Sequence, residues 1–273
     1  MKKIIVAIDF SKNSFHALEY AINLANQIKS EIIMIWVDKF DVSENVFSKG
    51  NIFRDEAIKN FSAIIKKYKN SLKYGTLDYK LKRGKIYHEI ASFAKSENAF
   101  LLITGAHGVS GFEQYWIGSN ANRIITYSPC PVITLRNDFK FNDKIKKIVL
   151  PIDSTKETSL KFKATSEFAE YFDSEIFIYK LYSTKLKSVH KRVDNYANQA
   201  KVLFDKKGIK YFEDDVITDN ITKSVLNYSE EINADLISIV TEQKRTATNI
   251  LLGQFAQQIV NNSKIPIMTI NND

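Results

Sequence analysis

The stretch KKIIVAID at residues 2–9 occurs again, little changed, as KKIVLPID at residues 146–153. Each copy is a short apolar run closed by an aspartate, without the polar alternation of a half-exposed strand. Such a run is typical of a strand buried on both faces of a parallel sheet. In both places a serine and a stretch with helical spacing of apolar residues follow. The sequence therefore contains the same strand–helix unit twice.

The two halves of the chain also end alike. Further matches pair residues 98–103 (NAFLLI) with 233–238 (NADLIS), and residues 131–135 (PVITL) with 266–270 (PIMTI). The opening segments lie 144 residues apart and the closing ones 135, so the second copy is nine residues shorter in its middle. Self-similarity on this scale predicts two homologous domains, residues 1–140 and 145–273, on either side of a polar stretch.

Each copy shows the same alternation of predicted elements. The order is strand, helix, strand, long helix, strand, helix, strand, helix, strand, with the long helices expected at 53–70 and 189–207. Alternating strands and helices predict an α/β fold, here two tandem five-stranded, mostly parallel sheets with helices on both faces. Such sheets bind ligands beyond the carboxyl ends of their strands, where the strand order reverses.

The composition excludes several classes of protein. The net charge of +8 comes from 39 Lys and Arg against 31 Asp and Glu, and the lysines alternate with acidic residues along the chain. This pattern favours a solvated basic surface over a nucleic-acid site. No apolar run approaches the roughly 20 residues of a membrane helix, and the opening run is too short for a signal peptide. One cysteine, Cys130, excludes an intrachain disulfide. We expect a cytoplasmic globular protein that binds neither nucleic acid nor a membrane.

Glycines carry the chemical signal. The fourth predicted strand of the first copy ends in Thr104-Gly105-Ala106-His107-Gly108, and after nine further residues Gly118-Ser119-Asn120 opens the next helix. Glycine lets a ligand approach the backbone closely, and a helix N-terminus attracts anions. The pattern therefore favours a phosphate site. The same residues are compatible with a tight turn followed by a helix that Ser119 caps.

The complete spacing G-x2-G-x9-G-S resembles the nucleotide-binding signature of the universal stress protein family. The segments VAIDFS at 6–11, IWVD at 35–38 and SPCPV at 128–132 are similar to other segments of that family. The resemblance covers the whole chain, since each of the two copies resembles one domain of the family. It implies Rossmann-type domains of the adenine nucleotide α-hydrolase-like kind that bind ATP, with Mg²⁺ bridging the phosphates.

The resemblance also implies roles for individual residues. Asp9 would contact the nucleoside, Ala7 and Ile8 would line the base, and Val37 would pack on adenine. Thr104 stands on the base side, where the family commonly has an apolar residue. His107 lies inside the glycine loop, where it either meets a phosphate or is solvated. The phosphates and Mg²⁺ would be held by the remaining motif residues, Gly105, Gly108, Gly118, Ser119 and Asn120.

The second copy departs from this signature. Its counterparts of Gly105, Gly108, Gly118 and Ser119 are Val240, Gln243, Gly253 and Gln254. The Cβ atoms of Val240 and Gln243 would obstruct a phosphate, so we expect no ATP site there, although Pro151-Ile152-Asp153 leaves a weak adenosine-type site as an alternative.

Pairing of the two copies is also implied. Domains of the family pair through their last strands, so residues 132–135 are expected to pair with 267–270 as an intramolecular pseudo-dimer that covers both edges. Further pairing of two chains into a homodimer is left open.

No catalytic constellation stands out. The four histidines are scattered, without metal-ligand spacing relative to Cys130 or a carboxylate cluster. The chain has no P-loop and no nucleophile elbow, and the glycine motif itself contains no lysine or arginine. We therefore expect neither a resident metal site nor a dedicated enzyme. Three functions remain: an ATP-binding stress or regulatory protein, a nucleotide-independent scaffold, and a slow ATPase.

Overall fold

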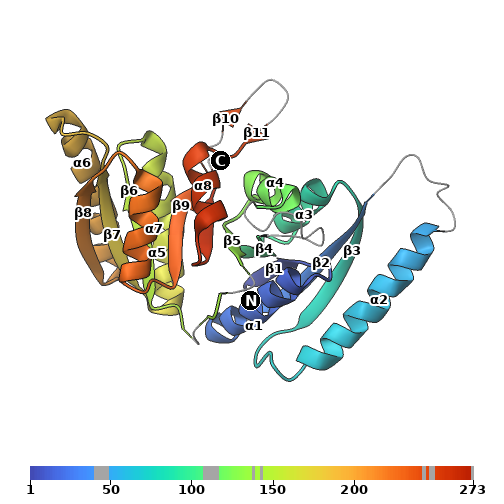
Figure 1. The fold of residues 1–273 in the computed structure, drawn as a ribbon. Helices are drawn as coiled ribbons and strands as arrows, with labels where there is room; N and C mark the ends of the chain where they lie inside the picture. Colours follow the sequence, from blue (N-terminus) through green and yellow to red (C-terminus); the bar gives the residue numbers. More distant parts are fainter. Residues whose placement is uncertain are drawn as a thin grey trace.

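The structure, a computed structural model, describes residues 1–39, 49–106, 117–136, 139–141, 144–241, 244–245 and 250–271. The elements of its first half are β1 (Lys3–Ala7), α1 (Lys12–Ile28), β2 (Glu31–Lys39), α2 (Lys49–Tyr68), β3 (Leu77–Gly84), α3 (Ile86–Ser96), β4 (Leu101–Gly105), α4 (Ser119–Tyr127) and β5 (Val132–Leu135). The predicted alternation of strands and helices is confirmed in this half (Figure 1).

The second half repeats the order, with a 3₁₀ helix before its first α-helix and two short strands before its last. Its elements are β6 (Lys147–Ile152), the 3₁₀ helix η1 (Lys156–Leu160), α5 (Lys161–Phe172), β7 (Glu175–Tyr182), α6 (Lys187–Lys207), β8 (Tyr211–Ile217), α7 (Ile221–Glu231), β9 (Leu236–Val240), β10 (Lys244–Arg245), β11 (Ile250–Leu251), α8 (Gln254–Asn262) and β12 (Ile267–Ile270). Where α1 begins directly as an α-helix, η1 precedes α5.

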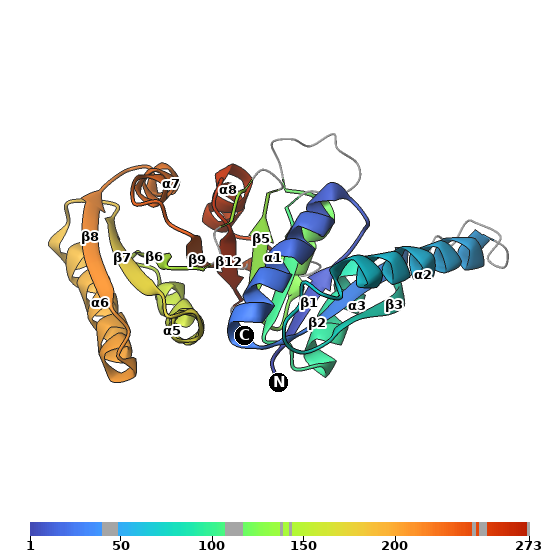
Figure 2. The same cartoon turned by 90° about the horizontal axis from the view of Figure 1, so that it is seen from below.

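All the long strands lie in one ten-stranded sheet. Their order is β3-β2-β1-β4-β5-β12-β9-β6-β7-β8, so each half contributes five neighbouring strands (Figure 2). Within each half the strands pair in parallel, whereas β5 and β12 pair antiparallel at the junction, with Ile133 opposite Met268. The pairing of the two last strands predicted from the sequence is confirmed.

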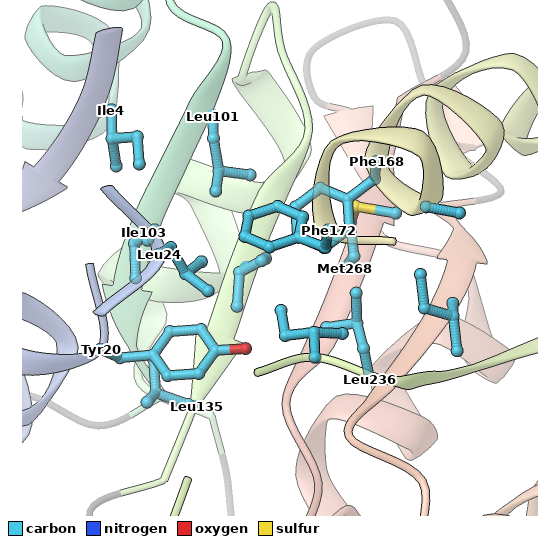
Figure 3. Close-up of a cluster of buried hydrophobic side chains, with 14 of the residues drawn as sticks. Ile4, Tyr20, Leu24, Leu101, Ile103, Leu135, Phe168, Phe172, Leu236 and Met268 are labelled. Atoms are coloured by element: carbon cyan, nitrogen blue, oxygen red, sulfur yellow. The ribbon is translucent and has the colours of Figure 1, made fainter. Parts of the chain in front are cut away.

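Helices cover both faces of the sheet, as predicted. The buried side chains of α1, α2, α5 and α6 belong to one apolar cluster, and those of α3, α4, α7 and α8 belong to another. The first cluster contains residues of both halves: Tyr20, Leu24 and Leu135 meet Phe168, Phe172 and Met268 (Figure 3). The junction of the halves is therefore part of a shared hydrophobic core.

Residues of the predicted boundary pack against α1. The rings of Phe139 and Phe141 lie 6.4 Å and 5.3 Å from the ring of Tyr20, and Phe141 also lies 5.4 Å from His16. The stretch between the halves is thus anchored on the first half by aromatic contacts. The exact limits, residues 140 and 145, stay predictions.

Candidate nucleotide site

The reversal of strand order places the candidate site. The chain passes from β1 to β2 on one side, and β4 pairs with β1 on the other. Ala7 lies opposite Ile35 and Val6 opposite Ile103, so the residues that follow these strands come together at one edge of the sheet. Asp9 follows the end of β1 by two residues, Val37 lies near the end of β2, and Gly105 is the last residue of β4. They therefore lie at the position where open α/β sheets bind ligands.

Hydrogen bonds fix the turn after β1. The backbone N–H of Ser11 donates to the carboxylate of Asp9 at 3.0 Å, and the N–H of Asp9 donates to Ser14 Oγ at 3.4 Å. Ser11 caps α1, its Oγ accepting from the N–H of Ser14 at 3.2 Å. The turn therefore holds Asp9 exposed at the edge of the sheet.

Phe10 adopts a left-handed backbone conformation in this turn. Its φ of 62° costs a non-glycine residue about 1–2 kcal/mol. The ring compensates by packing against Phe61 of α2, with ring centroids 5.1 Å apart, and against Trp36 of β2 at 6.5 Å. Strained residues held by their surroundings are concentrated at functional sites, which agrees with a ligand at this turn.

Gly105 is needed for the packing of α1 against β4. A Cβ atom at this position would lie 2.8 Å from Asn13 Cβ and 3.1 Å from the carbonyl carbon and oxygen of Asn13. The sequence suggested a glycine that clears space for a ligand. The structure gives Gly105 a second reason, because only glycine lets the first turn of α1 approach the end of β4 this closely.

Gly118 begins the helix that follows the glycine loop. Its N–H donates to the carbonyl of Ala106 at 2.9 Å, and it is the N-cap of α4, with no side-chain hydrogen bond at the cap. The alternative in which Ser119 caps the helix is wrong, since Ser119 is the first helical residue. Ser119 and Asn120 are exposed in the first turn, where backbone N–H groups lack partners within the helix and favour an anion.

The remaining predicted residues lie on different sides of the sheet. Ala7 and Val37 are buried in the cluster beneath α3 and α4, while Ile8 is buried in the cluster beneath α1. Thr104 is buried in β4, and its hydroxyl donates to the carbonyl of Gly105 at 3.3 Å. His107 and Gly108 lie outside the described residues.

Asn13 is not among the residues predicted from the sequence. Its Oδ1 atom is buried and has no hydrogen-bond partner among the described residues. The Cβ atom and the backbone carbonyl of Asn13 lie against Gly105 at the end of β4. Its signal in the sequence is its place four residues after Asp9, in the first turn of the following helix. A buried oxygen without a partner is costly, so a donor group at this edge would satisfy it.

The second half keeps the hydrogen bonds of this edge. The N–H of Thr155 donates to Asp153 at 2.9 Å, the N–H of Asp153 donates to Thr158 Oγ1 at 3.3 Å, and Gly253 donates to the carbonyl of Thr241. These contacts repeat those of Ser11, Asp9 and Gly118.

Its interior is filled differently. Val240 is buried at the end of β9, and the buried ammonium of Lys161 donates to Thr158 Oγ1 at 3.0 Å. The hydroxyls of Thr165 and Ser238 lie 2.7 Å apart. The corresponding residues of the first half are Gly105, Ala17, Ala21 and Ile103. Lys161 and Thr165 are larger than Ala17 and Ala21. Together with Val240 they keep α5 from packing on the sheet as closely as α1 does, which accounts for the 3₁₀ helix before α5. Gln243 lies outside the described residues.

Cys130 is held in a setting that suppresses its reactivity. Burial raises the pKa of its thiol to about 11, and the hydroxyl of Ser128, 3.6 Å from Sγ, offsets part of that rise. At pH 8 we expect iodoacetamide to label Cys130 about 100-fold more slowly in the native chain than in guanidinium, because the thiolate is the reactive form. Equal rates in the two states would contradict this assignment.

Among the described residues, no three or more His, Cys, Asp or Glu side chains gather as metal ligands would. In the same part of the chain, no helix combines the length and the hydropathy of a membrane span.

Comparisons with known proteins bear on the family of the chain. A model of the universal stress protein family matches residues 1–136. The universal stress protein YxiE of Bacillus subtilis is 28% identical over 145 residues, which are 49% of this chain and 98% of that protein. The universal stress protein MJ0531 of Methanocaldococcus jannaschii is 27% identical over 146 residues, covering 51% and 84% of the two chains.

The fold of the whole chain has a counterpart among solved structures. A universal stress protein from Archaeoglobus fulgidus superimposes with a TM-score of 0.79 at 19% identity, covering 99% of this chain and 98% of that one. The likeness extends over both halves and concerns the fold. Through residues 1–136, the chain therefore belongs to the universal stress protein family, whose role lies in the stress response.

Proposed function

We propose that the first half binds ATP and that nucleotide occupancy regulates the protein in the stress response. The observation that carries the proposal is the meeting of two features at one sheet edge. One is the exposed first turn of α4, directly after Gly118. The other is the exposed carboxylate of Asp9, at the reversal of strand order. An anion-binding helix start next to an acceptor for hydroxyl groups suits a nucleoside phosphate.

The residues divide into a base side and a phosphate side. Ala7, Val37 and Thr104 would line the base. Ile8 would contribute through its backbone, because its side chain is buried in the cluster on the other face of the sheet. Asp9 would accept hydrogen bonds from the nucleoside. Ser119 and Asn120 would bind the phosphates through N–H groups that have no partner within the helix, and Gly118 would let the phosphates approach the helix start. Gly105, His107 and Gly108 would contribute from the loop. Mg²⁺ would bridge the phosphates and partly neutralise their charge.

We assign no chemical step to the bound nucleotide. The motif contains no lysine or arginine that would stabilise a transferring phosphoryl group. The role that we propose for ATP is therefore that of a regulatory ligand.

The second half has a structural role in this proposal. Val240 and the buried hydrogen-bonded Lys161 occupy the interior where the first half has Gly105 and Ala17. The same half covers the edge of β5 with β12, which protects a strand edge that would otherwise be open to other chains. A scaffold function independent of nucleotide is the second candidate, and the filled second site favours it.

Calorimetric titration with ATP and Mg²⁺ tests the proposal. We expect one equivalent to bind the wild-type chain and Gly118→Val to weaken binding at least about tenfold, because the added side chain obstructs the phosphate N–H contacts. Gly253→Val is the matched control, since Gly253 caps α8 with nearly the same backbone angles (φ −60°, ψ 153°) as Gly118 has at α4 (φ −59°, ψ 144°).

The control variant should bind ATP like the wild type. Two equivalents per chain would contradict the structural role of the second half. No binding by the folded wild-type chain would favour the scaffold function instead.

A further inference from the structure

A side chain of the second half reaches the glycine motif of the first. Asn261 lies in the last turn of α8. This helix lies beside the junction of the halves (Figure 1). The Oδ1 atom of Asn261 accepts a hydrogen bond of 2.7 Å from the backbone N–H of Ile117, the residue directly before Gly118. Both residues are buried, with 8% and 7% of their surface exposed.

The contact gives the backbone N–H of Ile117 an acceptor from the second half of the chain. A buried backbone N–H without an acceptor costs about 1–3 kcal/mol, so the position of Ile117 depends on the Asn261 oxygen. The next N–H, that of Gly118, donates within the first half to Ala106. Two consecutive backbone donors at the start of α4 are thus held by acceptors from different halves of the chain.

We propose that Asn261 is a positioning residue through which the second half sets the geometry of the phosphate-binding turn in the first. The inference rests on the proposed ATP site, because Ser119 and Asn120, which follow Gly118, are the residues whose N–H groups would meet the phosphates. By thermodynamic linkage the effect is reciprocal, so ATP bound at this turn strengthens the contact between the halves.

The matching position of the first half carries a different side chain. It is Thr126, whose hydroxyl donates to the carbonyl of Asn122, one turn earlier in α4, at 2.8 Å. Asn261 has a longer side chain with an amide oxygen, and its main-chain carbonyl in turn accepts from Arg136 of the first half at 3.4 Å. The asymmetry gives the second half a specific task at the site of the first, although its own glycine motif is degenerate.

Asn261→Ala tests the proposal, with Asn262→Ala as its matched control. Asn262 is the adjacent residue of α8, is exposed, and donates to Gln258 of its own helix. In the nucleotide-free chain we expect faster hydrogen exchange at the Ile117 amide in Asn261→Ala alone. In the ATP titration we expect the same variant to bind about 5- to 30-fold more weakly, and the control to match the wild type.

Asn261→Asp retains an acceptor oxygen of the same reach and should restore slow exchange at Ile117. Far-UV circular dichroism and thermal unfolding check that each variant is folded. Unchanged exchange at Ile117 in Asn261→Ala would overturn the positioning role. Faster exchange with unchanged ATP affinity would overturn the coupling to the site. A wild-type chain that binds no ATP would overturn the proposed function and the coupling, while the exchange data would still decide whether Asn261 holds Ile117.

Discussion

Gly105→Val is expected to destabilise the chain by about 3 kcal/mol, measured by urea unfolding. The added Cβ would lie 2.8 Å from Asn13 Cβ and 3.1 Å from the backbone carbonyl of Asn13. The obstacle is helix backbone, not the end of a flexible side chain, so α1 must move away from β4. Overpacking of this kind costs about 1–3 kcal/mol, and the two further methyl groups of valine place the loss at the upper end.

The displacement would also reach the candidate site. Ser11, the N-cap of α1, and Ser14, in its first turn, hold the turn that carries Asp9. In the second half a valine stands at this position, and the helix begins there as 3₁₀. We therefore expect the variant to lose ATP affinity together with stability, since the start of α1 is pushed towards the arrangement of the second half.

Two further variants test whether the loss of stability in Gly105→Val comes from the steric clash with Asn13. Gly208→Ala adds a Cβ in open space at a φ of 65°, so it should cost about 1 kcal/mol through backbone conformation alone. In an Asn13→Gly background the loss caused by Gly105→Val should shrink, because part of the clash is removed. A double-mutant cycle measures this coupling, and strictly additive losses would contradict the contact.

Much of the fold could be predicted because the repeated segments include strands that are buried on both faces. The runs at 2–9 and 146–153 are apolar throughout, and a parallel strand covered on both faces permits little else. The same repeat fixed which elements correspond in the two halves. The similar last strands, 132–135 and 267–270, then led to the antiparallel pairing at the junction.

Features that depend on contacts between distant residues could not be predicted in this way. The alanines of α1 and the larger Lys161 and Thr165 of α5 are visible in the sequence. Their effect on the start of the helix depends on Val240, far along the chain. The sequence around Gly105 indicates space for a ligand, whereas the contact with Asn13 is visible only in the structure. The bond from Ile117 to Asn261 joins residues 144 positions apart, and no local pattern signals such a contact.

Ile133→Asp is expected to have the largest effect on stability, a loss of more than about 4 kcal/mol at pH 7. Ile133 is fully buried in β5, opposite Met268 of β12, in the core shared by both halves. A carboxylate at this depth has no solvent to reach, because the aspartate side chain is too short to extend out of the sheet. Urea unfolding followed by circular dichroism measures the loss, with Ile133→Val as the control at about 1 kcal/mol.

The dependence on pH identifies the cause of the loss. Burial should raise the pKa of the new carboxyl above its unfolded value of about 3.9. A raised pKa in the folded state means that the folded chain holds the proton more tightly than the unfolded one. The variant should therefore be closest to the wild type below about pH 4 and lose stability as the pH rises from there through the folded-state pKa. A loss independent of pH would point to misfit of shape at the junction, whereas a loss that grows with pH would show that the two halves exclude water where β5 meets β12.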